Sequence, residues 1–167
     1  DESIIVRDEL TKVRNEEWSG VQAKWAEVPK DLKVTFGKSK ETYKTLIADL
    51  ATAQKEDVPQ VLSNSFLSKK GKSITKTIAD WQGKPQVISE EQTITTIKEM
   101  QGLRAKLLEE ARIARAANQW NKARISEDMA DAILDDLMVS AEGIPTAAGE
   151  FLSVALAATK QFKNRFQ

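Results

Sequence analysis

The stretch from Ser89 to Gly143 is the feature that most constrains the fold of this chain. Its apolar residues recur at helical steps of three and four, at Ile94, Ile97, Met100, Leu103, Leu107, Ala111 and Ala114. The run Ser89-Glu90-Glu91-Gln92 matches a capping box, in which the first and fourth side chains satisfy backbone N–H groups at a helix start. Gly143, with Pro145 just beyond, is a common helix stop. The pattern therefore predicts helix across 89–143.

A single rod and a helical hairpin are both open for this stretch. Asn118, Asn121 and Ser126 offer a place to turn, and Ser126 is followed by acidic residues that suit the first turn of a helix. Basic side chains dominate residues 98–124, and acidic side chains dominate residues 126–150. Because helices of opposite charge lie together favourably, the charge pattern favours the hairpin, although each exposed pair contributes only about 0–1 kcal/mol.

The rest of the chain predicts further helices. They cover residues 1–28 with an interruption at Ser19-Gly20, residues 39–55, a short segment after Pro59, residues 73–81 ended by Gly83, and the segment from Pro145 onward. Residues 29–38 alternate apolar and polar side chains as a strand does. Since no partner strand is recognisable, we interpret them as an extended connector.

Length and pattern together predict an all-α fold. The chain has 167 residues, enough for one domain with a core. We expect a bundle of six or seven helices with 89–143 as a long central helix or helical hairpin. Residues 1–167 are expected to form a single helical domain, with a subdivision into 1–88 and 89–167 as the alternative. Because the chain begins at Asp1 without Met, we expect a fragment of a larger protein.

The residue types present leave little room for catalysis. The chain has no His and no Cys, which excludes Ser/His/Asp and Cys/His arrangements. Asp128, Asp131 and Asp135 share one helix face and could hold Mg²⁺ or Ca²⁺, but pairing with the basic residues 104–124 is the favoured interpretation. We predict no catalytic residue, no cofactor, no cofactor-binding residue and no metal site. A hydrolase built on acidic residues is the least favoured alternative.

Protein is the expected partner. The net charge is zero, and the lysines of the loop 69–76 have no interleaved aromatic or arginine, so nucleic acid is not expected. The helix Phe151–Phe166 carries Lys160, Lys163 and Arg165 and could lie on a membrane surface. Large apolar side chains at helical spacing are the candidates for contact surfaces, each with a buried core position as its alternative: Trp18, Trp25, Phe151, Leu152, Leu156, Phe162 and Phe166.

The carboxy-terminal part of the sequence resembles a known class of proteins. The segment Ala130–Leu137, a break containing Gly and Pro, Phe151, and the segment Lys160–Phe166 resemble helical segments of very large bacteriophage internal virion or ejection proteins. The similarity covers residues 105–167 and lies in helix-forming residues. It carries no enzymatic motif of those proteins, so the resemblance implies a structural module.

The resemblance implies a role in assembly. We expect a non-enzymatic structural and interaction module of a phage virion, located in the virion and contacting further copies of itself or other virion subunits. Without the resemblance, the sequence indicates only a soluble chain of unspecified compartment. The alternative is a helical translocation or receptor-binding piece of a secreted bacterial toxin.

Overall fold

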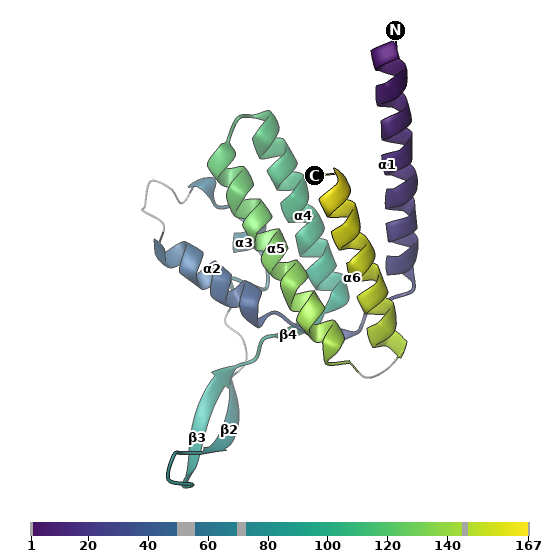
Figure 1. The fold of residues 1–167 in the computed structure, drawn as a ribbon. Coiled ribbons are helices and arrows are strands. Elements are labelled where there is room, and N and C mark those ends of the chain that lie inside the picture. Colours follow the sequence, from purple (N-terminus) through teal and green to yellow (C-terminus); the bar gives the residue numbers. More distant parts are fainter. Residues whose placement is uncertain (1, 50–55, 70–72, 145–146, 167) are drawn as a thin grey trace. The chain divides into compact units, whose positions relative to one another are not determined.

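A computed structural model describes residues 2–49, 56–69, 73–144 and 147–166 of the chain. These residues are mostly helical (Figure 1). Their contacts divide the chain into two compact units, one formed by Asp1–Leu32 with Leu137–Gln167 and the other by Lys33–Asp136. We call them the terminal unit and the central unit. The single domain, with a subdivision into 1–88 and 89–167 as the alternative, remains a prediction.

Six helices and four strands make up the described residues. The helices are α1 (Glu2–Ala26), α2 (Gly37–Asp49), α3 (Gln60–Ser63), α4 (Ile97–Ala116), α5 (Trp120–Glu142) and α6 (Ala147–Phe166). The strands are β1 (Lys33–Thr35), β2 (Ser73–Ala79), β3 (Pro85–Glu91) and β4 (Ile94–Thr96). The predicted predominance of helix is confirmed. The strands form two antiparallel two-stranded sheets, so the fold is not a pure helical bundle.

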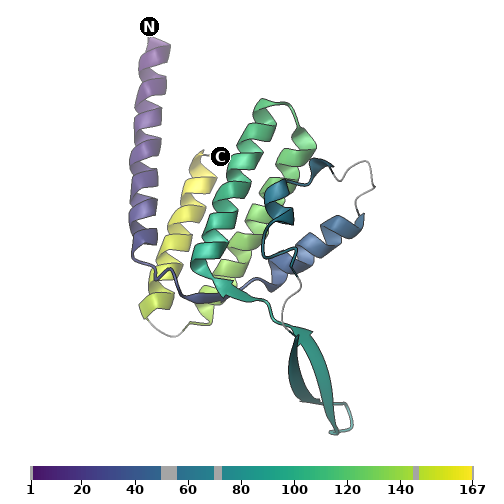
Figure 2. The ribbon, with the colours of Figure 1, turned by 180° about the vertical axis from the view of Figure 1, so that it is seen from behind.

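The stretch after residue 96 forms a helical hairpin, as Figure 2 shows from behind. Residues 117–119 make the turn, where Asn118 has a φ of 59°. Asparagine tolerates this left-handed conformation better than most residues. Opposite charges meet near the turn, because Arg115 donates two hydrogen bonds to Glu127, at 2.8 and 2.6 Å.

The core of the central unit follows the predicted helical stripes. Met100, Leu103 and Leu107 on α4 and Ile125, Met129 and Ile133 on α5 are all buried. Burial of these apolar faces is favourable by about 25 cal/mol per Å² of apolar surface removed from water. Periodicity therefore located the buried face of α4.

The predicted helix start at Ser89 is wrong. Ser89 lies in β3, and α4 begins at Ile97, where the Thr96 hydroxyl accepts a hydrogen bond from the Glu99 backbone N–H at 3.4 Å. The predicted helix over 73–81 is wrong as well, because those residues form β2 and a turn. β-Branched Thr and Ile residues dominate β2 and favour extended backbone.

The interpretation of residues 29–38 as an unpaired connector is also wrong. Residues 33–35 form β1, which pairs antiparallel with β4, and Val34 lies opposite Thr95. Val34 and Phe36 are buried. The partner strand lies inside the stretch that the capping motif assigned to helix.

In the terminal unit, α1 packs against α6. Val21, Ala158 and Phe162 form a buried cluster, against which Trp25 and Phe166 pack. Helix α1 is continuous through Ser19 and Gly20, where the sequence predicts an interruption. The Ser19 hydroxyl donates to the Asn15 carbonyl one turn earlier, at 3.0 Å, so this polar side chain is accommodated without a break in the helix.

Three predicted features fall partly or wholly outside the described residues. They are the end of the helix predicted for 39–55, the basic loop at 70–72, and Pro145. Within the described ranges, α2 ends at Asp49, and the short helix after Pro59 covers Gln60–Ser63. Helix α5 ends at Glu142, just before the predicted stop at Gly143.

Candidate functional site

Four of the seven predicted interaction residues meet within the terminal unit. The ring centroids of Trp18 and Phe162 are 5.0 Å apart, and those of Phe162 and Phe166 are 4.9 Å apart. The Trp25 indole Nε1 donates to the Thr159 hydroxyl at 2.8 Å. Tilted aromatic pairs at such distances are favourable beyond their area burial. These side chains therefore contribute to the contact between α1 and α6.

The other three predicted residues differ in exposure. Leu152 and Leu156 are buried, whereas Phe151 is 43% exposed. The buried stripe of α6 thus runs through Leu152, Ala155, Leu156 and Phe162, and Phe151 lies outside it. Of the predicted set, Phe151 and the partly exposed Trp18 are the most accessible to another molecule.

A second candidate surface, which the sequence does not predict, is the hairpin of β2 and β3. It projects from the helical part of the central unit (Figures 1 and 2). Seven residue pairs form its ladder, from Ser73 opposite Glu91 to Ala79 opposite Pro85. We call residues 73–91 the arm. A two-stranded hairpin alone is only marginally stable in water, so its local contacts matter.

The apex of the arm is a tight turn organised by Asp80. The Asp80 carboxylate accepts hydrogen bonds from the backbone N–H groups of Gln82 and Lys84, at 2.9 and 2.8 Å. The Gly83 N–H donates to the Asp80 carbonyl at 3.0 Å, and Gly83 has a φ of 79°. A three-residue hairpin loop that ends with a left-handed glycine has this arrangement.

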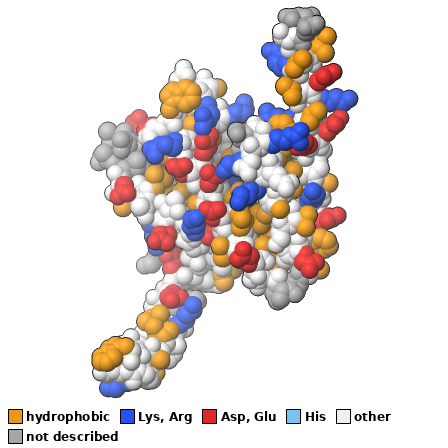
Figure 3. All heavy atoms as spheres, in the orientation of Figure 1, with side chains coloured by type: hydrophobic (Ala, Val, Ile, Leu, Met, Phe, Trp, Pro, Cys, Tyr) orange, Lys and Arg blue, Asp and Glu red, His pale blue; other side chains and the backbone are white. Residues whose placement is uncertain are grey.

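The turn presents a tryptophan to solvent. Trp81 is 91% exposed, and Val87 on β3 is 70% exposed. Figure 3 shows hydrophobic side chains gathered near the tip of the arm. Tryptophan is usually at least partly buried, and it is enriched at the energetic centres of protein interfaces. The apex of the arm is therefore a candidate contact surface.

Replacing Gly83 with alanine is expected to destabilise the arm. A left-handed residue with a Cβ loses about 1–2 kcal/mol relative to glycine. Hydrogen exchange of the β2 and β3 amides should become several-fold faster in Gly83→Ala. Gly102, on an exposed face of α4 where a Cβ would meet nothing within 4 Å, is the matched control. Gly102→Ala should leave arm exchange unchanged, and equal effects of the two substitutions would contradict this account.

Buried Lys40 on α2 contacts the segment that precedes the arm and the last residue of the arm. The Lys40 side chain is 8% exposed, and its Nζ donates to the carbonyl oxygens of Leu67 and of Lys69, the latter at 2.8 Å. The same Nζ lies 3.5 Å from Glu91 Oε1. Lys69 precedes the arm and Glu91 ends it. Two hydrogen bonds and one ion pair of the ammonium group thus reach the chain before the arm and the residue that ends it.

The first turn of α2 is capped by a carboxylate of α5. Buried Asp136 accepts hydrogen bonds from the Lys38 N–H at 3.1 Å and from the Ser39 N–H and hydroxyl at 2.7 and 2.6 Å. A negative charge at a helix N-terminus satisfies free N–H groups and complements the helix dipole. The neighbouring Asp135 accepts a hydrogen bond from Lys38 Nζ at 2.6 Å, and this hydrogen bond raises the pKa of Lys38.

The acidic face of α5 is engaged by cations. Asp135 pairs with Lys38, and the carboxylate of Asp131 acts on the Arg104 guanidinium. Burial lowers the pKa of Arg104, and Asp131 opposes that effect. Among the described residues, no group of three or more His, Cys, Asp or Glu side chains is arranged to hold a metal ion.

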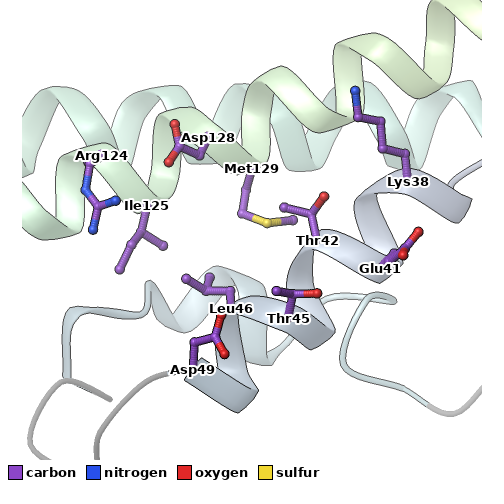
Figure 4. A pocket seen from close by; sticks show the side chains of 10 residues that line it. All are labelled: Lys38, Glu41, Thr42, Thr45, Leu46, Asp49, Arg124, Ile125, Asp128 and Met129. Atoms are coloured by element: carbon purple, nitrogen blue, oxygen red, sulfur yellow. The ribbon is translucent and has the colours of Figure 1, made fainter.

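An open groove lies between α2 and α5 (Figure 4). Its volume is about 490 Å³, and Leu46, Ile125 and Met129 line it together with Lys38, Glu41, Thr42, Thr45, Asp49, Arg124 and Asp128. Three acidic and two basic side chains are among the residues that line it. Because both signs of charge are present, the groove favours neither an anionic nor a cationic ligand.

Comparisons with protein families, with curated proteins and with solved structures find no match for this chain. Within the described ranges, no helix has the length and apolar character needed to cross a bilayer.

Sequence reasoning missed the arm and Lys40 for different reasons. The order Asp80-Trp81-Gln82-Gly83 between two segments rich in β-branched residues is a hairpin signal that could have revealed the arm. Lys40 is one of several lysines on an amphipathic helix. No pattern in the neighbouring sequence indicates that this lysine is buried.

Proposed function

We propose that this chain is a non-enzymatic structural and interaction module of a bacteriophage virion, of the internal or genome-ejection kind. In this proposal the module docks on a protein partner through the arm. The resemblance of residues 105–167 to helical segments of such proteins supports the class. The observation that carries the docking role is the almost fully exposed Trp81 at the apex of an anchored arm.

The physical basis of the docking role is the cost of leaving the arm unpartnered. Both faces of the ladder are largely exposed, so the arm buries little of its own apolar surface. Both outer edges of a two-stranded hairpin also carry backbone N–H and C=O groups that water or another chain must satisfy. Docking would bury Trp81 in a pocket of the partner and shield the ladder.

Site-specific photocross-linking tests the proposal. A photoreactive phenylalanine derivative is placed at position 81 in the full protein, produced in the cells where it normally assembles. We expect one discrete adduct, identified by mass spectrometry as another structural subunit of the particle. Trp120, 60% exposed at the start of α5, provides the control position.

Position 120 should give little or no adduct. Equal, unspecific labelling from both positions would contradict docking through the arm. A discrete adduct from position 81 with a protein that is not part of a virion would retain the docking role and contradict the phage assignment.

A further inference from the structure

The N-terminal half of α1 carries an apolar stripe that no described residue covers. Val6, Leu10 and Val13 are 55%, 61% and 38% exposed. Figure 1 shows that the first turns of α1 continue past the C-terminal end of α6, and Figure 3 shows hydrophobic side chains along them. Arg165 on α6 pairs with Glu17 and marks where the contact between the two helices ends.

The stripe has the spacing of a coiled-coil seam. Val6 and Val13 are one heptad apart and take the d position, and Leu10 lies between them at a. Trp18, Val21 and Trp25, which face α6, take b and e positions of the same register. The exposed stripe is therefore a neighbouring face of α1, and covering it leaves the contact with α6 in place.

Charged side chains lie along both flanks of the apolar stripe. Arg7 and Arg14 occupy the e positions along one flank, and Glu9 and Glu16 occupy the g positions along the other. Within the described residues, no ion pair engages any of these four side chains. One flank of the seam is thus basic and the other acidic.

This arrangement is complementary to itself in one orientation only. In a parallel pair of helices, the g flank of each helix faces the e flank of the other, so Glu9 of one copy faces Arg14 of its partner. In an antiparallel pair, e faces e and g faces g, which opposes arginine to arginine and glutamate to glutamate. Such like-charge contacts disfavour the antiparallel pair.

We propose that residues 3–16 of α1 form a self-association surface, which pairs in parallel and in register with the same segment of a second copy of this chain. Three seam residues in each copy bury little area, so the pairing is weak and depends on concentration. It is strengthened wherever many copies are held close together, because a high effective concentration favours weak contacts. This inference is independent of docking through the arm.

The absence of cysteine allows a direct test of register. Val6→Cys places a thiol at the seam, where a parallel, in-register pair brings the two thiols together. Asp8→Cys places a thiol on the outer side of the same helix as the control. In a glutathione redox buffer, we expect several-fold more disulfide-linked dimer from Val6→Cys than from Asp8→Cys.

Charge reversal tests the choice of partner. Adding Arg14→Glu to Val6→Cys should reduce the linked fraction several-fold, and further adding Glu9→Arg should restore it by reversing the charges of the pair between positions 9 and 14. Circular dichroism and sedimentation velocity confirm that each variant stays folded. Equal linking of Val6→Cys and Asp8→Cys, or no response to charge reversal, would overturn the proposal.

A lipid surface is the other occupant that an apolar stripe beside arginines would fit. Binding of the chain to vesicles of phosphatidylcholine and phosphatidylglycerol, without preferential linking of Val6→Cys, would also overturn self-association. Arg14→Glu should leave the adduct from position 81 unchanged. Failure of self-association and failure of docking through the arm are therefore separately observable.

Discussion

Replacing Lys40 with methionine is expected to lower the free energy of unfolding of the central unit by about 3 kcal/mol. Methionine has a similar length but no donor, so the carbonyl oxygens of Leu67 and Lys69 lose the hydrogen bonds that Nζ supplies. The Glu91 side chain is 26% exposed. In this variant it retains the ion pair with Lys44 but loses the ion pair with the buried ammonium group of Lys40. Urea denaturation followed by circular dichroism measures the change in stability.

Lys44→Met is the matched control for Lys40→Met. Lys44 pairs with the same carboxylate at 2.9 Å, but its side chain is 61% exposed. Exposed pairs contribute about 0–1 kcal/mol, so Lys44→Met should change the stability by no more than that. Hydrogen exchange at residues 67–69 and 85–91 should accelerate in Lys40→Met alone. Equal losses in the two variants would contradict the role of Lys40 as the anchor of the arm.

The sequence predicts those parts of the fold where burial repeats with the helical period. The spacing of Met100, Leu103 and Leu107 identified the buried face of α4, and Asn118 is where the helical hairpin turns. Over some twenty residues a helix repeats its apolar positions several times, so one misleading residue does not hide the pattern. Helix α6 was located by the same kind of repeat.

Short strands in this chain lack that redundancy. β1 has three residues, and its partner β4 is far away in the sequence, so no local pattern shows the pairing. The arm is exposed on both faces and lacks the alternation of apolar and polar residues that marks a half-buried strand. Because this alternation is missing, no strand pattern opposed the match of Ser89-Glu90-Glu91-Gln92 to a helix cap. The backbone of β3 is nevertheless extended there.

The candidate sites could be predicted only in part. Aromatic spacing selected Trp18, Trp25, Phe162 and Phe166, which the structure brings together in the terminal unit. It did not indicate that they contact one another. The anchor at Lys40 depends on contacts between segments about thirty or more residues apart, which the sequence pattern does not encode locally.

Replacing Phe162 with alanine is expected to lower the free energy of unfolding of the terminal unit by about 3–5 kcal/mol, the usual loss for a buried phenylalanine. Phe162 is 8% exposed and packs against both Trp18 and Phe166. Truncation would leave a cavity between α1 and α6 and loosen Trp18. Thermal denaturation followed by tryptophan fluorescence, with urea titration for the free energy, measures the effect.

Phe151→Ala separates a stabilising role from a surface role for the aromatic residues of α6. Phe151 lies on the same helix but is 43% exposed, so its truncation should change the stability by about 1 kcal/mol or less. Light scattering on both variants reports any change in association. If Phe162→Ala left the stability unchanged and abolished association, Phe162 would be a contact residue for another molecule, and the packing of α1 on α6 would not be its main role.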